Sequence, residues 1–446
     1  MNRLTVRNWS RRLVSAAMLM GSLTSVAGVT CRVEPDYGVR EADKPGTAYV
    51  KVTLAADKVT AKSRPSVNLA IVLDRSGSMH GAAIERAREA ACEAVRRLDE
   101  RDVISVVAYD DVTETVVPAQ RVVDREGIIA KIRRIDARGM TALFAGVAAG
   151  ASELAKFRGK CEISRVLLLS DGQANVGPST AEELGRYGAM LMKDGVAVST
   201  VGLGNCYNED LMTRLSQKSD GNSYYVANSE DLTKVFASEL GDVLSVAATK
   251  VQLKVRFGEG FAPVQLVGRD GRIADGVASI DLNQLYGGQE KYVIVKCDAA
   301  PGKVGAAREI AKAEVSFFNP VDEKQQTVTG VASVTYSEDL AAVKASVNRS
   351  VVKETIFNEN ALRVEEAIRS ADKGDFAAAQ RAITSNAAAV RQAQADLGDD
   401  EELDAELKSQ VDVFSRSFRR ENYSSRERKG AKTKSFQQFN QQKFKW

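Results

Sequence analysis

Residues 67–78 read Val-Asn-Leu-Ala-Ile-Val-Leu-Asp-Arg-Ser-Gly-Ser, and this stretch decides the fold. Its first seven residues are almost all apolar, which is typical of a strand buried on both faces of a parallel sheet. The run then changes to Asp74, Ser76 and Ser78, with Gly77 giving the backbone freedom to turn. Ligands of open parallel sheets bind beyond the carboxyl ends of the strands. We therefore expect a buried strand that delivers three oxygen-bearing side chains to one edge of a sheet.

Short apolar runs alternate with amphipathic segments from this stretch to about residue 245. The apolar runs lie at 67–73, 103–109, 166–169, 196–201 and 224–226. The helical segments lie at about 81–98, 124–134, 142–157, 180–193, 208–217 and 230–245. This alternation predicts an α/β domain with a doubly wound, mostly parallel sheet covered on both faces, and we assign it residues 66–245.

A second kind of pattern surrounds this domain. Apolar and polar residues alternate from Val251 to Phe257, which predicts a half-exposed antiparallel strand. Further strands are expected at about 290–297, 311–318 and 327–336, so residues 246–337 are assigned to a small β-sandwich. The N-terminal segment 28–65 contains a strand at 47–55 with the same alternation. We expect this strand to join the later sheet, which makes the α/β domain an insertion into the β-sandwich.

The C-terminal third divides into a helical region, 338–418, and a basic tail, 419–446. Phe376, Ile383, Val390 and Leu397 recur every seven residues, after a turn at Gly374-Asp375. The spacing admits a coiled-coil seam, but four positions fall short of a long one, so a helical hairpin or bundle is favoured. The tail has few aliphatic residues, and we expect it to be disordered.

Charge and composition exclude several classes of site. The 446 residues carry a net charge of +3, with +4 in residues 1–27 and +7 in the tail, so the body carries −8. His80 is the only histidine, which excludes a multi-histidine zinc site and leaves one residue for any Ser-His-Asp or Cys-His mechanism. The five cysteines form no Cys-x-x-Cys pair, which excludes zinc ribbons and thioredoxin-type redox chemistry.

Residues 1–27 have the layout of a secretory signal peptide, with a basic start, an apolar stretch and small residues before the end. We expect Sec-dependent export to the periplasm or cell surface, with cleavage near Ala27. Ser10-Arg11-Arg12 leaves a twin-arginine (Tat) signal as an alternative. A short membrane anchor and a lipoprotein attached at Cys31 are less consistent with the sequence.

Two further segments bring oxygen donors to the same edge of the predicted sheet. Asp171 follows the apolar run 166–169, and Thr141 lies just before a helix. The candidate metal ligands are therefore Asp74, Ser76, Ser78, Thr141 and Asp171. Carboxylate and hydroxyl oxygens, with no sulfur or imidazole, suit Mg²⁺ or Mn²⁺ and argue against zinc and copper. Such a shallow site leaves one position for an outside ligand, and an Asp or Glu carboxylate of a partner fits it.

These motifs resemble the metal-ion-dependent adhesion site (MIDAS) of von Willebrand factor type A (VWA) domains. The resemblance covers about residues 66–245 and is carried by Asp74-x-Ser76-x-Ser78, Thr141 in Gly-Met-Thr-Ala-Leu and Asp171 in Ser-Asp-Gly. The chain is also similar to bacterial exported VWA proteins and, more distantly, to inter-alpha-trypsin inhibitor heavy chains. The resemblance implies metal binding by these residues and a role in protein adhesion or assembly. Arg75 occupies a variable position of the motif, where a cation can weaken metal affinity or steer an acidic partner.

We therefore expect an exported, non-enzymatic protein that presents Mg²⁺ to an acidic residue of an unknown protein partner. A phosphatase with Asp74 as nucleophile needs a second acid where Ser76 stands, and a Ser78 nucleophile would need His80 as its base. The alternative is a structural scaffold of an envelope complex whose metal site only stabilises the fold. The C-terminal helices offer a second contact or a surface for self-association. The tail offers a contact to an anionic envelope surface, and nucleic acid is the less favoured partner.

Overall fold

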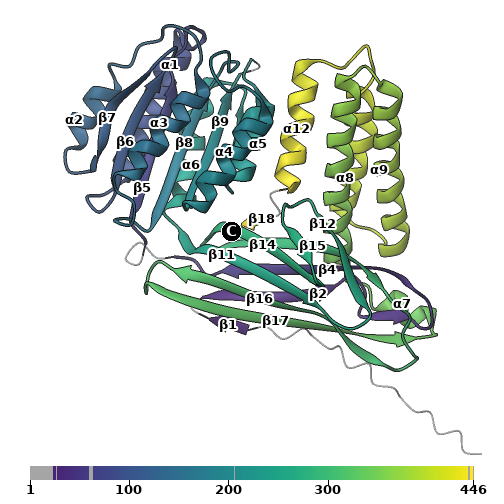
Figure 1. The fold of residues 1–446 in the computed structure, drawn as a ribbon. Helices are drawn as coiled ribbons and strands as arrows, with labels where there is room; N and C mark the ends of the chain where they lie inside the picture. Colours follow the sequence, from purple (N-terminus) through teal and green to yellow (C-terminus); the bar gives the residue numbers. More distant parts are fainter. Residues whose placement is uncertain (1–23, 27, 60–63, 205, 440–441, 445–446) are drawn as a thin grey trace, which may run out of the picture.

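The chain folds into an α/β unit, a pair of β-sheets and a helical unit (Figure 1). The structure, a computed structural model, describes residues 24–26, 28–59, 64–204, 206–439 and 442–444. Residues 1–23 and 27, which hold most of the predicted signal peptide, lie outside the described residues. In Figure 1 the α/β unit and the helical unit stand side by side above the two sheets.

The α/β unit contains a mostly parallel six-stranded sheet with the order β10-β9-β8-β5-β6-β7. Its strands are β5 (Val67–Asp74), β6 (Val103–Tyr109), β7 (Thr113–Arg121), β8 (Ile163–Ser170), β9 (Val196–Leu203) and β10 (Ser223–Val226). The antiparallel edge strand β7 was not predicted. It is largely exposed and contains Pro118, so it lacks the apolar run that marks the central strands.

Helices cover both faces of this sheet, as the sequence predicted. They are α1 (Ala82–Arg97), α2 (Arg125–Ile132), α3 (Leu143–Ala155), α4 (Ala181–Lys193), α5 (Glu209–Lys218) and α6 (Leu232–Val243). Leu69, Ile71 and Leu73 of β5 pack in one core with α1, α2 and α6. Ala70 and Val72 point to the other face, where they pack with α3, α4 and α5. This alternation buries β5 completely and fixes its C-terminal end at the rim of the sheet.

The other two sheets share one apolar core and are built from antiparallel strands, with one short parallel pair between β17 and β3. One sheet has the order β1-β2-β4-β15-β12, with β18 also paired to β15, and the other has the order β13-β14-β11-β16-β17-β3. The strands are β1 (Thr24–Val26), β2 (Val29–Pro35), β3 (Val39–Glu41), β4 (Gly46–Ala56), β11 (Val246–Phe257), β12 (Phe261–Val267), β13 (Arg272–Ala274), β14 (Val277–Tyr286), β15 (Gln289–Ala299), β16 (Ala307–Asn319), β17 (Lys324–Ser337) and β18 (Gln442–Phe444).

Strand β4 pairs with β15 from Gly46 to Ala55, so the α/β unit is inserted into the β-sandwich as predicted. The chain leaves the sandwich after β4, forms the α/β unit and returns at β11. Strands β2, β12, β13 and β14 were not predicted. Pro263 and a register shift interrupt β12, and the polar residues Asn283 and Gln284 are buried in β14, so neither strand shows clean alternation in the sequence.

The helical unit is a bundle within the chain rather than a coiled coil. Its elements are α7 (Leu340–Ala345), α8 (Arg349–Asp372), α9 (Phe376–Leu397), α10 (Glu401–Lys408), a π-helical turn (Ser409–Phe414), α11 (Ser415–Ser417) and α12 (Ser425–Phe439). Helices α8 and α9 form a hairpin, with Gly374 at a positive φ of 82° and Asp375 capping α9. The seven-residue spacing places Ile383, Val390 and Leu397 in the core of this bundle.

The predicted disorder of residues 419–446 is wrong for residues 425–439 and 442–444, which form α12 and β18. The prediction considered only the apolar residues of the tail itself. In the structure Ala431 and Phe436 of α12 are buried, and Lys429, Lys432 and Lys434 pair with carboxylates of other segments. Contacts distant in the sequence thus fold a segment that cannot fold alone. Among the described residues, no helix has both the length and the apolar character needed to cross a membrane.

Candidate metal centre

The five predicted ligands come from three loops at one rim of the parallel sheet. Asp74 ends β5, and Asp171 directly follows β8, its parallel neighbour. Ser76 and Ser78 lie in the turn between β5 and α1, where Gly77–Met79 form a 3-10 helix. Thr141 lies two residues before α3, which packs against β5. The sheet topology therefore brings together residues that are almost 100 positions apart in the sequence.

Hydrogen bonds connect four of these residues. The Ser78 hydroxyl donates to Oδ1 of Asp171 at 2.6 Å. The Ser76 and Ser78 hydroxyl oxygens lie 3.1 Å apart, and the backbone N–H of Ser76 donates to Oδ1 of Asp74 at 2.8 Å. The structure thus orients these oxygens toward one another.

Thr141 lies near the same group. A Cβ atom placed on Gly172 would lie 3.0 Å from Oγ1 of Thr141 and 3.6 Å from Oγ of Ser78, so both hydroxyls border the space beside Gly172. Several hydrogen bonds hold the Thr141 loop in place. Thr141 N–H donates to the side chain of Asn175 at 3.0 Å, and Gly77 N–H donates to the carbonyl of Gly139 at 2.9 Å. All five predicted ligands therefore gather around one small region.

Electrostatics favour a cation at this position. Asp74 is fully buried, and its carboxylate accepts hydrogen bonds from Ser170 at 2.7 Å and from Tyr109 at 3.4 Å. Burial raises the pKa of Asp74 to about 6, although the hydrogen bonds to Ser170 and Ser76 oppose the shift, and the charge of Asp171 raises it further. Burial also raises the pKa of Asp171. In the part of the chain that the structure describes, neither carboxylate forms an ion pair with a lysine or arginine.

Arg75, the basic residue inside the motif, does not compensate these carboxylates. Its guanidinium is buried, and Nε donates to Oδ2 of Asp110 at 2.8 Å, while Nη1 donates to Glu114. Arg138 donates to the same Asp110 oxygen at 2.9 Å. The cation that the sequence placed next to the metal site is therefore neutralised by its own acidic partners.

The donor set is suited to a hard divalent cation. Within the described ranges, no three or more His, Cys, Asp or Glu side chains are grouped to hold a metal. The candidate centre instead combines two carboxylates with three hydroxyls, which are oxygen donors of the kind that Mg²⁺ and Mn²⁺ prefer. His80 is exposed, and the hydroxyl of Ser78 donates to Asp171 rather than to His80.

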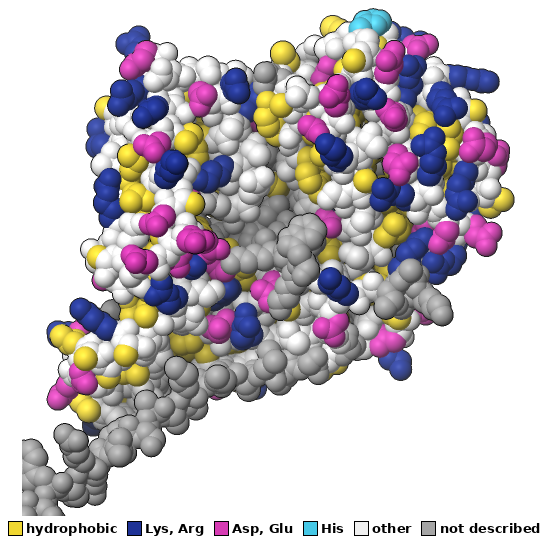
Figure 2. Space-filling model, turned by 180° about the vertical axis from the view of Figure 1, so that it is seen from behind, with side chains coloured by type: hydrophobic (Ala, Val, Ile, Leu, Met, Phe, Trp, Pro, Cys, Tyr) yellow, Lys and Arg dark blue, Asp and Glu magenta, His cyan; other side chains and the backbone are white. Residues whose placement is uncertain are grey.

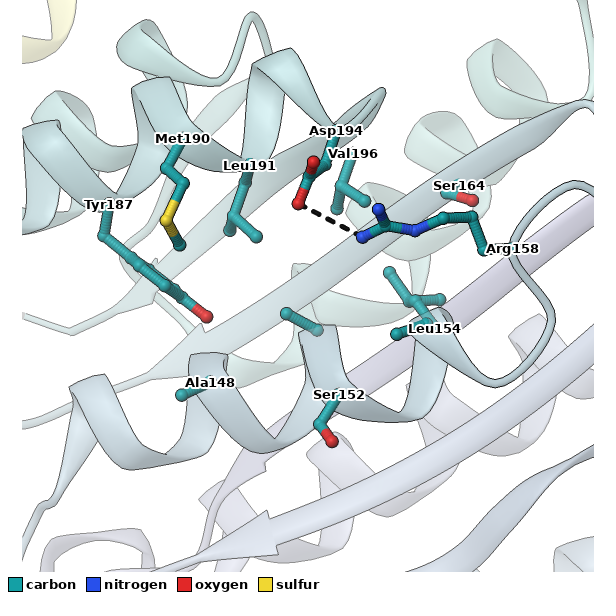
Figure 3. Close-up of a pocket in the computed structure, with 12 residues that line it drawn as sticks. Ala148, Ser152, Leu154, Arg158, Ser164, Tyr187, Met190, Leu191, Asp194 and Val196 are labelled. Carbon is teal, nitrogen blue, oxygen red and sulfur yellow. Dashed lines mark hydrogen bonds and ion pairs between the residues drawn. The ribbon is translucent and has the colours of Figure 1, made fainter.

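A separate small cavity lies at the opposite end of the sheet. It has a volume of about 240 Å³ and lies between α3 and α4 (Figure 3). Tyr187 and Met190 of α4 face Ala148 and Ser152 of α3 across it, and the ion pair between Arg158 and Asp194 lies at one end. Ser164 and Val196, which also line it, belong to the starts of β8 and β9, so the cavity is remote from Asp74.

Comparison with a family model covers most of the α/β unit. Residues 68–238 match the family model described as von Willebrand factor type A domain. The chain contains a VWA domain. The resemblance inferred from the sequence is thereby confirmed for this part of the chain.

Curated relatives share the VWA domain with the chain. It is 29% identical over 204 residues to the uncharacterized protein sll0103 of Synechocystis, which covers 46% of this chain and 48% of that protein. It is 30% identical over 210 residues to the uncharacterized protein YfbK of Escherichia coli, and the match covers 47% of this chain and 36% of that protein. A more distant relative is the inter-alpha-trypsin inhibitor heavy chain H3 of Rattus norvegicus, at 25% identity over 199 residues. This match covers 42% of this chain and 22% of that protein. The chain spans about half or less of the length of these relatives.

Likeness to a solved structure extends beyond the VWA domain. The structure of a von Willebrand factor type A protein from Catenulispora acidiphila superimposes with a TM-score of 0.67 and 16% sequence identity. The match covers 86% of this chain and 89% of that one. The similarity therefore includes elements outside residues 68–238, and it confirms the predicted fold class.

Proposed function

We propose that the VWA domain binds Mg²⁺ through Asp74, Ser76, Ser78, Thr141 and Asp171 and presents it to an acidic side chain of a protein partner. One observation carries this proposal: two carboxylates that lack a lysine or arginine partner among the described residues share one rim with three hydroxyls, and hydrogen bonds orient most of these groups toward one another. Mn²⁺ is the alternative ion, because it accepts the same oxygen ligands.

A bound Mg²⁺ supplies a positive charge that attracts a carboxylate. Ser78 is exposed, whereas Asp74, Ser76 and Thr141 are buried, so the site opens to the surface on the Ser78 side. VWA domains generally mediate protein–protein binding, which agrees with an incoming Asp or Glu as the last ligand. We propose a binding role rather than catalysis, since the Ser78 hydroxyl is committed to Asp171 and His80 is exposed.

We further propose that the protein acts outside the cytoplasm, at the cell surface or in the periplasm, as the sequence of residues 1–27 indicates. Its partner there is a protein, and the charge on the face drawn in Figure 2 agrees with this choice. Figure 2 shows Lys and Arg side chains intermingled with Asp and Glu over the visible face, without the continuous basic surface that nucleic acid or an anionic membrane would attract.

A scaffold whose metal only stabilises the fold is the second candidate. The hydrogen bonds that tie three loops together at the site favour it, because a cation there would brace those loops. In the scaffold, partners bind through other surfaces and do not require the ion.

Chelation distinguishes the two functions. Purified protein would be used to capture partners from an envelope extract, with Mg²⁺ or with EDTA, beside the variants Asp74→Ala and Asp136→Ala. Asp136 is a highly exposed carboxylate of the same domain and serves as the matched control. A metal-presenting domain loses capture with EDTA and with Asp74→Ala but keeps it with Asp136→Ala. Capture that survives EDTA and Asp74→Ala contradicts the proposal and supports the scaffold.

A further inference from the structure

Helix α12 is anchored on the helical unit through one of its faces. Ala431 and Phe436 are buried, and the Ser435 hydroxyl donates to Glu365 of α8 at 2.9 Å. The segment before α12 is fixed as well, because the ring of Tyr423 stacks on Phe418 and its hydroxyl donates to Asp372 at 2.7 Å. The side chains of α12 are therefore held in defined positions, from which they can contact the VWA domain.

The same side of α12 also contacts the VWA domain at the N-terminus of α5. In Figure 1 α12 lies on the side of α8 that faces α5. Arg428 pairs with Glu209 at 2.5 Å and Asp210 at 2.6 Å, and also with Asp372 of α8 at 2.8 Å. Lys432 adds a second bridge, since it pairs with Asp210 at 3.3 Å and with Glu365 at 2.5 Å. Two basic side chains thus join the VWA domain to the helical unit.

Lys429 makes the most buried of these contacts. Its side chain is 2% exposed and pairs with Glu209, and its ammonium group donates to the carbonyl of Tyr207 at 2.5 Å and lies 4.4 Å from the centre of the Tyr207 ring. A lysine buried to this extent is strongly destabilising without its partners. Lys429 can therefore be buried only when Tyr207 and Glu209 are in place.

Tyr207 connects this contact to the metal site. It lies in the loop between β9 and α5, and its ring packs on Gly202 of β9, where a Cβ atom would approach within 2.3 Å of it. The neighbouring Cys206 carbonyl accepts a hydrogen bond from the side chain of Gln173. Gln173 is two residues after the candidate ligand Asp171, so the loop that Lys429 holds also holds the loop that carries Asp171.

We propose that α12 is a latch whose docking on Tyr207 and Glu209 favours the metal-binding arrangement of the VWA domain, so that α12 docking and Mg²⁺ binding strengthen each other. This inference rests on the Mg²⁺ binding proposed above and adds its regulation by the C-terminal helix. Coupling between two sites is reciprocal: if α12 raises the affinity for Mg²⁺, then Mg²⁺ must stabilise the docked state of α12 by the same factor. A ligand or partner that displaces α12 from the VWA domain would therefore weaken metal binding.

The first test measures Mg²⁺ affinity by isothermal titration calorimetry in the full chain and in Lys429→Met. We expect binding to weaken by about 5-fold or more, within the usual range of allosteric coupling. Arg426→Ala is the matched control, because Arg426 is an exposed basic residue of the same helix. The Mg²⁺ affinity of this variant should equal that of the unmodified chain. Equal affinities in all three proteins contradict the latch. No Mg²⁺ binding in the unmodified chain contradicts the proposed function itself, so the two failures are distinct.

The second test needs no substitution in the buried contact and covers the case in which Lys429→Met does not fold. Amide hydrogen exchange of the unmodified chain would be followed with and without Mg²⁺. The latch predicts slower exchange in α12 and in the first turn of α5 when Mg²⁺ is present, and Lys432→Ala, whose side chain is less buried, should reduce that protection. Protection confined to the loops of the metal site, with α12 unchanged, overturns the proposal.

Discussion

Arg165 of β8 lies with Nη1 at 3.1 Å from Oε1 of Glu239 on α6, and both side chains are completely buried, with exposed fractions of 0% and 1%. Nη2 of Arg165 donates to the side chain of Gln284 at 2.6 Å and also to the hydroxyl of Tyr286. Gln284 and Tyr286 belong to β14 of the sandwich. The VWA domain is therefore attached to the β-sheets by buried hydrogen bonds from Arg165, whose charge is compensated by Glu239 within the domain.

Breaking this pair should destabilise the protein strongly. Removing one partner leaves an uncompensated buried charge, so Arg165→Met and Glu239→Gln should each lower the free energy of unfolding by about 3–5 kcal/mol. The double variant should lose less unfolding free energy than the two single variants lose in sum, because neither charge is then left without its partner. Urea unfolding of the four proteins measures this. Arg186→Ala, which removes an exposed ion pair with Glu182, should change the free energy by less than about 1 kcal/mol.

Mg²⁺ should stabilise the folded chain through Asp74. If only the folded state binds the ion, a concentration about 100 times the dissociation constant adds roughly 2.7 kcal/mol to the free energy of unfolding. Asp74→Asn should lose this increment, because the substitution removes one of two carboxylates at the site. Thermal unfolding with and without Mg²⁺ provides the measurement. An Asp74→Asn protein that is stabilised as much as the unmodified chain would show that the ion binds elsewhere.

Gly172 should strengthen metal binding because of the space it leaves beside Thr141. A Cβ atom at this position would approach Oγ1 of Thr141 to 3.0 Å, which is closer than nearly all such contacts, so Gly172→Ala must displace the hydroxyl. We expect Mg²⁺ affinity to fall by about 10-fold, which corresponds to roughly 1.4 kcal/mol. The control is Gly241→Ala in α6, where a Cβ atom has no neighbour within 4 Å among the described residues. Calorimetric titration should find that control unchanged.

Asp36 should make stability depend on pH in a region remote from the metal site. Burial raises the pKa of its carboxyl from 3.8 to about 6, although Arg40 and backbone hydrogen bonds oppose the shift. Between these two pH values the folded state holds a proton that the unfolded state has lost. The contribution of Asp36 to the free energy of unfolding therefore falls as the pH rises from about 4 to 6. The loss should reach about 3 kcal/mol, at 1.36 kcal/mol for each pKa unit.

The variant Asp36→Asn isolates this contribution. Its carboxamide does not titrate, so the difference in unfolding free energy between the two proteins should change with pH over that range and level off above about pH 7. Guanidinium unfolding at a series of pH values gives that difference. A constant difference would mean that the pKa of Asp36 is not raised in the folded state.

The sequence determined the parallel sheet and its ligand-bearing rim. The run from Val67 to Leu73 is apolar on both faces, and such a run can be stable only between two layers of helices. The residues after it, and those after the buried parallel strand that ends at Ser170, must then lie at the same edge. Asp74 and Asp171 could therefore be placed together from periodicity and motif order alone, before any contact between them was known.

Periodicity could not predict the edge strands, because partly exposed segments such as β7 lack a continuous apolar pattern. It also gave the wrong state for residues 425–439. Their apolar content is low, and their helix is stabilised by carboxylates such as Glu209, Asp210 and Glu365, which lie far away in the sequence.

The sequence by itself thus fixed the buried strands, the insertion of the VWA domain and the identity of the candidate ligands, because these follow from local hydrophobic patterns and from the direction of parallel strands. Only the tertiary structure decided how the units are joined. Arg165 with Gln284, and Lys429 with Tyr207, are pairs separated by 119 and 222 positions. A charged residue carries no local signal of its partner, since its burial becomes favourable only after the fold has brought the opposite charge or a carbonyl to it.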